Sequence, residues 1–316
     1  MKFLVSVIIP VFNVEQFVEK AIISALQQPE VFEVVVVNDG STDNSLQIIT
    51  KLQAEYSRVK LCHHPNLVNK GRSASRNLGI KKAICNYIAF LDADDYYLEN
   101  RFTNDKIVFE QNTDVDGVYN AIGVHFYRDI DILEQNELKL YTVKAKTKSN
   151  QLFETLFFGN KGHFSIIGLT VKKSVFNSIG YFNEFLMVME DTELFYKMAL
   201  KCNLETGIIK KPLAIRGVHD ANIFNKKDYY RLYRIKVYES LFLWCCKNDI
   251  SVTTIDIILK RLWTVKYKEE PSLLKNIGFW NTLFFKNPKQ LFSITAVKYF
   301  PVIRLRRKLF PFLFRS

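Results

Sequence analysis

Apolar runs and amphipathic segments alternate along the first hundred residues of the chain. Four mostly apolar runs predict buried strands, and the first of them is rich in β-branched residues. They are Leu4–Ile9, Val31–Val37, Val59–Cys62 and Tyr87–Leu91. Between them, Val14–Leu26 and the segments after Asp43 and Gly71 repeat apolar residues at helical spacing. Strands that alternate with helices predict an α/β fold with a mostly parallel central sheet flanked by helices.

The alternation weakens in the second hundred residues, where the pattern predicts strands at Ala121–Phe126 and Ile166–Val171. The last ninety residues read as helical, aromatic and basic. We therefore expect an α/β domain of residues 1–222, with halves 1–100 and 101–222, and a C-terminal helical extension of residues 223–316.

Polar residues follow the predicted strands at the edge of the sheet where α/β proteins bind ligands. The run that ends at Leu91 continues as Asp92-Ala93-Asp94-Asp95. Carboxylates this crowded repel one another unless a cation lies between them, and Mg²⁺ or Mn²⁺ would take such oxygens together with a phosphate. A solvated turn that caps the next helix is the alternative reading.

Three further positions carry candidate chemistry at the same edge. Asp39 ends the second strand and would accept a hydrogen bond from a base, whereas Lys70 and Arg76 would meet phosphate or base oxygens. An ordinary helix cap and a surface charge are the alternatives for Asp39 and Arg76.

Glu190 and Asp191 open a later helix. A carboxylate there would serve as a general base, or the pair would only favour the helix dipole. His219 lies in a loop after a strand, where a packed or solvated histidine is the common case.

The chain has 316 residues and a net charge of +12, which implies an anionic partner: a nucleotide, a phospholipid surface or a nucleic acid. No apolar run reaches the length that spans a bilayer. Between Pro301 and Pro311 the sequence predicts about two and a half helical turns, with cations interleaved among Leu and Phe. Such a tail suits a membrane interface, or it packs on the catalytic part with its cations in water.

These blocks together resemble the family 2 glycosyltransferases, which are inverting enzymes with the GT-A (nucleotide-diphospho-sugar transferase) fold. The matching blocks are Val5–Pro10, Phe12–Glu15, Val36–Asp43, Asn69–Gly79, Phe90–Asp95 and Glu190-Asp191. The resemblance is strong over the first third, thinner to about Asn222 and absent beyond. It implies a nucleotide-binding half in residues 1–100 and an acceptor half in residues 101–222.

The resemblance implies that one group of residues holds the nucleotide-sugar, usually a UDP-sugar. Its members are Pro10, Phe12, Glu15, Asp39, Lys70, Arg76, Asp92 and Ala93. Within this group Asp39 would bind the base and Asp92 would face the ribose or the sugar. Phe12 stands where tyrosine is frequent in the family, so no hydroxyl is available at that position.

The resemblance also implies the catalytic and metal-binding residues. Asp191 would be the catalytic base, with Glu190 beside it. Asp94 would ligate Mg²⁺ or Mn²⁺ on the diphosphate, and His219 resembles a late histidine that reaches the metal. Arg216 is one residue too far from His219 for the usual Arg-x-His arrangement and is left out of the predicted site.

The predicted function is transfer of a sugar from a UDP-sugar to a hydroxyl of a saccharide or lipid-linked saccharide, in cell-surface polysaccharide synthesis. We expect a cytoplasmic protein, peripheral on the inner face of the membrane. A sugar-nucleotide nucleotidyltransferase would need a Gly-rich basic loop after the first strand, which Pro10-Val11-Phe12-Asn13 is not. A non-catalytic nucleotide-binding or membrane scaffold would not need Asp94 and Asp191 together. No nucleic-acid module is recognisable, and the cations concentrate late in the chain.

Overall fold

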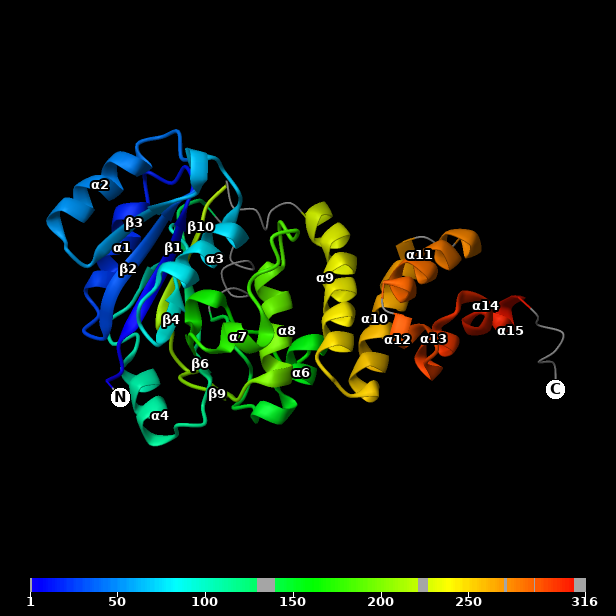
Figure 1. The fold of residues 1–316 in the computed structure, drawn as a ribbon. Coiled ribbons are helices and arrows are strands. Elements are labelled where there is room, and N and C mark those ends of the chain that lie inside the picture. Colours follow the sequence, from blue (N-terminus) through cyan, green and yellow to red (C-terminus); the bar gives the residue numbers. More distant parts are fainter. Residues whose placement is uncertain (1, 130–139, 221–226, 270–271, 287, 310–316) are drawn as a thin grey trace. The chain divides into compact units, whose positions relative to one another are not determined.

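The computed structural model describes residues 2–129, 140–220, 227–269, 272–286 and 288–309, and the chain forms two compact units, residues 1–225 and 226–316. Unit 1 is built on a seven-stranded sheet with the order β3-β2-β1-β4-β8-β6-β9 (Figure 1). The strands are β1 Val5–Val11, β2 Val31–Asn38, β3 Val59–His63, β4 Tyr87–Phe90, β6 Gly117–Tyr119, β8 Leu169–Lys172 and β9 Leu204–Thr206. The first four in sequence pair in parallel, as predicted, because each returns through a helix.

The helices of unit 1 lie on both faces of this sheet. They are α1 Val18–Leu26, α2 Ser45–Glu55, α3 Arg72–Lys82, α4 Thr103–Gln111, α6 Ser149–Phe158, α7 Val175–Ile179 and α8 Glu190–Lys201. Helices α1 and α2 cover one face beside β1–β3, and α3 packs on β1 and β2 from the other (Figure 1). The fold is therefore the predicted α/β architecture, with a mostly parallel sheet between helices.

Two predicted elements begin more than two residues away from their start in the structure. Helix α1 begins at Val18 rather than at Val14, because the backbone N–H groups of residues 13–15 donate to side chains of the loop before α2 and of its first residue, Ser45. The strand predicted at Ile166–Val171 begins only at Leu169. Residues 166–168 form a 3₁₀ turn instead, and Gly168 there leaves no room for a side chain against the carbonyl of Asn120.

The second sheet of unit 1 has three strands: β5 Tyr96–Tyr97, β10 Ala214–Val218 and β7 Ile122–Phe126. Strand β10 is central, antiparallel to β5 and parallel to β7. Since β5 follows the Asp92–Asp95 turn directly, this pairing carries the residues after β10 to that turn.

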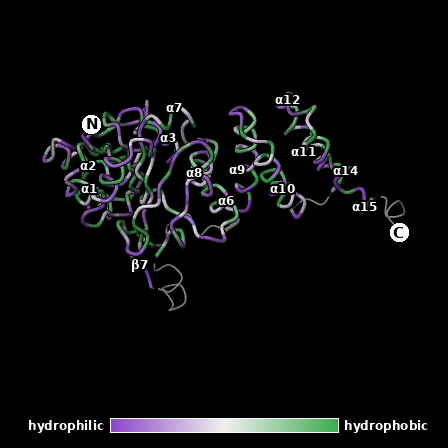
Figure 2. The backbone as a smooth tube through the Cα atoms, turned by 90° about the horizontal axis from the view of Figure 1, so that it is seen from below, coloured by the Kyte–Doolittle hydropathy of each residue, from purple (hydrophilic) through white to green (hydrophobic). Residues whose placement is uncertain are grey.

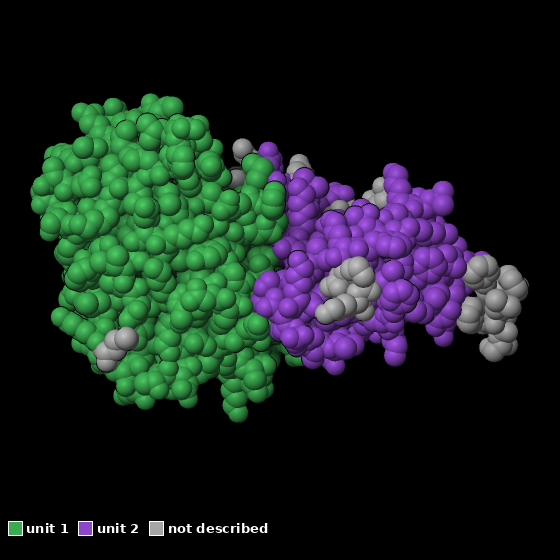
Figure 3. Space-filling model, viewed as in Figure 1, with its two compact units in different colours: residues 1–225 green, residues 226–316 purple. Residues whose placement is uncertain are grey.

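Unit 2 is helical throughout its described residues. Its helices are α9 Lys227–Lys247, α10 Val252–Glu269, α11 Leu273–Phe285, α12 Pro288–Leu291, α13 Ile294–Tyr299, α14 Pro301–Arg304 and α15 Arg306–Leu309. Hydrophilic and hydrophobic residues mix along them (Figure 2), and Phe242 of α9 packs edge-on against Phe284 of α11 at 5.4 Å. Figure 3 colours this unit purple and unit 1 green.

The C-terminal tail departs from the prediction of one continuous helix after Pro301. Helices α14 and α15 are separate single turns, because Leu305 leaves the helical conformation between them. Residues 310–316 lie outside the described part of the chain. Among the described residues, no helix combines the length and the apolar character that crossing a membrane requires.

Candidate active site

Arg76 of α3 joins two acidic segments at the carboxyl edge of the large sheet. Its guanidinium donates to Asp92, the residue directly after β4 and Leu91, at 2.5 Å. It also donates to Glu190, the first residue of α8, at 2.8 Å. The side chain of Arg76 is only 1% exposed. Two predicted site segments that lie a hundred residues apart in sequence are thus held by one buried cation.

The charges in this network shift one another's pKa values. Burial disfavours the charge on Arg76, but Asp92 and Glu190 outweigh it and raise the pKa of Arg76. Burial likewise opposes ionisation of Asp92, but Arg76 above all lowers its pKa below the ordinary value. Burial is the largest influence on Glu190 and raises its pKa, against the pull of Arg72 and Arg76. Asp92 is therefore firmly anionic, whereas Glu190 is costly to ionise.

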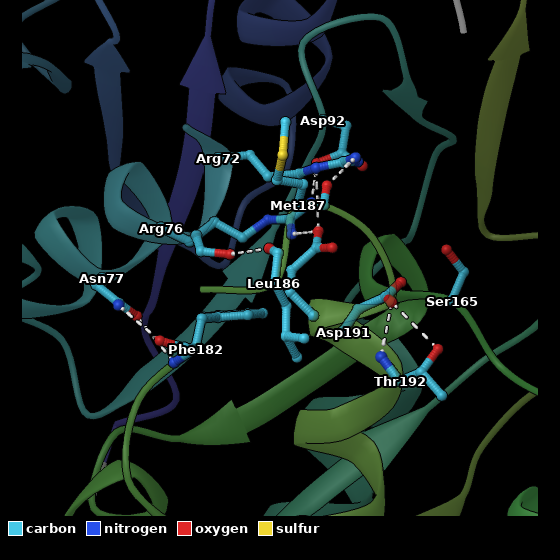
Figure 4. A network of polar contacts seen from close by, with 12 residues as sticks. Arg72, Arg76, Asn77, Asp92, Ser165, Phe182, Leu186, Met187, Asp191 and Thr192 are labelled. Carbon is cyan, nitrogen blue, oxygen red and sulfur yellow. Dashed lines mark hydrogen bonds and ion pairs between the residues drawn. The ribbon is translucent and has the colours of Figure 1, made fainter. Parts of the chain in front are cut away.

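Helix α3 also ties down the loop that leads into α8. Arg72 donates to the carbonyl of Met187 at 3.1 Å and lies 3.2 Å from Glu190. Asn77 exchanges hydrogen bonds with the backbone of Phe182, donating at 2.9 Å and accepting at 2.9 Å. These contacts fix the point where α8 begins, immediately before Asp191 (Figure 4).

Asp191 lies in the first turn of α8 and is partly exposed. Its Oδ1 accepts the backbone N–H of Thr192 at 2.6 Å and lies 3.3 Å from the Thr192 hydroxyl. Three acids in this first turn suit the positive end of the helix dipole. The placement fits either alternative raised by the sequence, a dipole partner or an exposed base.

Asp94 and His219 meet at the junction of the two sheets. Asp94 Oδ2 lies 3.0 Å from His219 Nε2, and the side chains are 23% and 17% exposed. The His219 ring stacks on Phe17 at 5.0 Å, which sets its orientation. Both side chains are reachable from solvent. The Asp94 carboxylate suits Mg²⁺ or Mn²⁺ with phosphate oxygens in the rest of the shell, whereas the His219 nitrogen is a softer ligand that suits Mn²⁺ better than Mg²⁺. The described residues hold no cluster of three or more His, Cys, Asp or Glu suited to a metal.

Asp95 and Arg216 belong to the site although the sequence analysis did not select them. Asp95 accepts the N–H of Gly217 at 2.8 Å, and burial, with the charges of Asp94 and Asp92, raises its pKa. Arg216 donates to Ser165 at 3.1 Å, and its pKa is raised by Asp95 against the effect of burial. A lone arginine inside the otherwise apolar strand β10 is the sequence signal that could have drawn attention to it.

Asp39 and Glu15 hold the backbone of neighbouring loops. The buried carboxylate of Asp39 accepts the N–H groups of Lys70 at 2.7 Å and Gly71 at 2.8 Å. Glu15 accepts the N–H of Asn44 at 2.8 Å. Asp39 therefore anchors the loop before α3 and does not cap the helix that follows β2, whose N-cap residue is Asn44. The predicted contacts to a nucleoside stay predictions.

The other residues predicted to bind the nucleotide differ in exposure. The ring of Phe12 and the side chain of Lys70 are exposed, Pro10 is half-buried in β1, and Ala93 is buried. Phe12 and Lys70 are therefore the members of this group most open to a ligand, whereas Ala93 could contribute only backbone.

Comparisons of the sequence with known proteins point to one family. The family model described as "Glycosyl transferase family 2" matches residues 6–166. An uncharacterized glycosyltransferase of Haemophilus influenzae is 34% identical over 171 residues, 54% of this chain and 62% of that protein. Another, from Rickettsia felis, is 40% identical over 286 residues, 88% of this chain and 44% of its own length. The chain thus spans less than two thirds of these relatives.

Solved structures show the same fold. Staphylococcus aureus TarS 1–349 in complex with UDP-GlcNAc matches with a TM-score of 0.63 at 18% identity, over 96% of this chain and 92% of that one. The complex of the same fragment with UDP matches with a TM-score of 0.61 at 19% identity, over 96% of this chain and 91% of that one. Unit 1 therefore has the GT-A type of α/β fold that the sequence predicted.

Proposed function

Because the chain belongs to glycosyl transferase family 2, we propose that it moves a sugar from a nucleotide-diphosphate donor to a hydroxyl of an acceptor. The observation that carries the proposal is the bridge made by Arg76, which binds Asp92 at 2.5 Å and Glu190 at 2.8 Å. This bridge holds the edge of the large sheet, which we expect to face the donor, close to helix α8, which bears Asp191. A UDP-sugar is the donor we favour, since TarS fragments of the same fold bind UDP and UDP-GlcNAc.

In the proposed reaction Asp191 is the general base. It takes the proton of the acceptor hydroxyl as the oxygen attacks the anomeric carbon, and the nucleoside diphosphate leaves from the opposite side, which inverts that carbon. A carboxylate is a weak base, so it acts late, on a hydroxyl that is already losing its proton. Holding donor and acceptor in line lowers the barrier further. Glu190 binds Arg76 and Arg72 and thereby positions Asp191.

Asp94 and His219 would hold a Mg²⁺ or Mn²⁺ ion, since their oxygen and nitrogen lie side by side. Such an ion would supply positive charge to the diphosphate. Around it we assign the nucleoside to Pro10, Phe12, Glu15 and Asp39, and the ribose or sugar to Asp92 and Ala93. Lys70, whose side chain is exposed, would meet a phosphate, and Arg76 would act on the nucleotide through Asp92.

We assign the acceptor to saccharides or lipid-linked saccharides, the pathway to cell-surface polysaccharide synthesis, and the location to the cytoplasmic face of a membrane. The basic tail supports a peripheral association, because Arg304, Arg306, Arg307 and Lys308 would each gain ~1 kcal/mol near an anionic surface.

A screen of UDP-sugars for metal-dependent release of UDP tests the proposed function. Release from one UDP-sugar with Mn²⁺, lost on chelation and in Asp191→Asn, is the expected result. A protein that binds UDP but releases none from any UDP-sugar, with or without saccharide acceptors, would be the nucleotide-binding scaffold instead.

A further inference from the structure

The net positive charge of the chain resides in unit 2. Residues 226–316 contain 19 Lys and Arg against 6 Asp and Glu, a net charge of +13. Residues 1–225 contain 25 against 26, a net charge of −1. An anionic surface would therefore attract the helical unit and leave the unit with the candidate active site nearly unaffected.

The same unit exposes large apolar side chains where α13 begins. We call residues 292–297 the α13 cap segment. Within it Phe292 is 90% exposed, Ile294 86% and Val297 55%. Phe292 precedes the N-cap residue Ser293, and Val297 is the fourth residue of the helix, two positions whose apolar side chains normally pack together. At 90% exposure Phe292 packs against almost nothing.

The α13 cap segment is well anchored beneath these side chains. Ser293 Oγ accepts the N–H of Ala296 at 3.2 Å and so caps the helix. Trp280 of α11 donates to the carbonyl of Ala296 at 3.0 Å, and its ring meets Phe300 edge-on at 5.1 Å. Phe292 and Ile294 therefore project from a fixed turn, and docking them costs little ordering of the backbone.

We propose that the α13 cap segment inserts Phe292 and Ile294 into the interface of an anionic phospholipid bilayer. The cations of unit 2 supply the attraction and the two side chains supply the apolar anchor, the pair of signals that stable peripheral binding needs. The inference rests on the proposed membrane association but gives the apolar contact to this segment rather than to the tail after Pro301. The net charge of +13 argues for an anionic bilayer as the occupant of this apolar surface.

Vesicle co-sedimentation tests the anchor, with phosphatidylcholine alone and with an equal mixture of phosphatidylcholine and phosphatidylglycerol. The key variant is Phe292→Ser with Ile294→Ser, which removes only exposed groups. Phe185→Ser is the matched control, a phenylalanine that is 88% exposed in unit 1. Arg306→Gln with Arg307→Gln probes the charges of the tail. Release of UDP and thermal unfolding are followed for every variant.

The parent chain should bind the mixed vesicles and not pure phosphatidylcholine. The double serine variant should bind at least ~100-fold more weakly, since burial of each large apolar side chain is worth roughly a factor of ten or more. UDP release and unfolding should not change, and the Phe185 control should bind like the parent. The arginine variant should keep the anchor, bind more weakly at low salt and depend less on salt, because fewer charges are left for salt to screen.

The results that would contradict the proposal can be told apart from one another. Unchanged vesicle binding by the double serine variant, with loss of binding in the arginine variant, removes the anchor and leaves association through the tail. Unchanged vesicle binding by the double serine variant, with a loss of self-association in sedimentation velocity without vesicles, assigns the segment to a second copy of the chain. A parent chain that binds neither vesicle removes membrane association altogether, while UDP release tests the enzymatic proposal separately.

Discussion

The carboxylate of Asp94 lies 3.0 Å from His219 although 125 residues separate them in sequence. The pairing of β10 with β5 produces this proximity, because β5 follows the acidic turn and β10 ends just before His219. Gly217 completes the junction, since a Cβ at this position would lie 2.2 Å from the carbonyl oxygen of Asp94. The small sheet therefore builds the candidate metal site from two otherwise unrelated segments.

Removing either member of this pair should weaken binding of UDP in the presence of Mn²⁺. We expect Asp94→Asn and His219→Ala each to lose at least ~10-fold in affinity, a typical cost for a disturbed metal site. Affinity measured with a chelator present should stay as in the parent. Calorimetry with and without Mn²⁺ makes the comparison, and His125→Ala, an exposed histidine of the same small sheet, is the control. Equal Mn²⁺-dependent affinity in parent and variants would contradict the assignment.

Gly217→Ala should damage the same site without removing a ligand. The added methyl group has to displace the backbone of Asp94 or of β10, at a cost of about 1–3 kcal/mol in stability. We expect a lower unfolding temperature and weaker Mn²⁺-dependent UDP binding. Gly278→Ala is the control, because nothing lies within 4 Å of its added Cβ, and in the middle of α11 it should stabilise by up to about 1 kcal/mol. A Gly217→Ala chain that binds UDP like the parent would show that the junction tolerates movement.

Local pattern predicted the parallel half of the sheet because continuous Val and Ile runs leave few alternatives to buried strands. It also predicted that the acids after β2 and β4 share one edge, since parallel strands end on the same side. It could not predict that β8 runs antiparallel between β4 and β6, or that β10 joins β5 and β7. Those pairings join segments far apart in sequence, and no short-range spacing encodes them.

The partners of Arg76 show the same limit of prediction from sequence within the site. A cation at a helix start near the ligand edge predicts a phosphate or base contact. In the structure the side chain is buried between Asp92 and Glu190, the latter 114 residues away. A guanidinium takes whichever carboxylates the fold brings within reach, and the fold at this point depends on where α8 begins. Sequence therefore indicated that Arg76 matters, but not what it binds.

Arg76→Gln should destabilise unit 1 strongly. It leaves Asp92 without its partner cation and Glu190 with Arg72 alone, and breaking such a buried pair costs about 3 kcal/mol or more. Adding Glu190→Gln should restore part of the loss, because one of the two carboxylate charges is then removed. Urea unfolding of the parent, the two single variants and the double variant gives the interaction free energy between Arg76 and Glu190. We expect it to lie between about 0.5 and 3 kcal/mol. Lys51→Gln on α2, an exposed cation, should change stability by less than about 0.5 kcal/mol. Strict additivity would mean that the two residues do not interact.

The raised pKa of Glu190 predicts a pH-dependent contribution to stability. Burial raises it above the ordinary value of 4.5, so the folded chain keeps this proton to a higher pH than the unfolded chain. The contribution is therefore fully present below pH 4.5 and is lost as pH rises through the raised pKa. Since Glu190→Gln does not titrate, the stability of the parent relative to this variant should fall over that range, by at most about 1.4 kcal/mol per pH unit. Urea unfolding from acid to neutral pH measures it, and a constant difference would contradict the shift.

Asp191→Asn should separate binding from transfer. Asparagine keeps the size of the side chain and an oxygen for the N–H of Thr192, which now lies 2.6 Å from Asp191, so the start of α8 should be preserved. Without a base the transfer rate should drop at least ~100-fold, whereas UDP affinity should match the parent. Glu154→Gln, an exposed carboxylate on α6, is the control for a neutralised acid elsewhere in the unit. Near-normal release of UDP by Asp191→Asn, with the UDP-sugar found in the screen, would take the role of base away from this residue. Helix α8 would then contribute to the site only through the ion pair between Glu190 and Arg76.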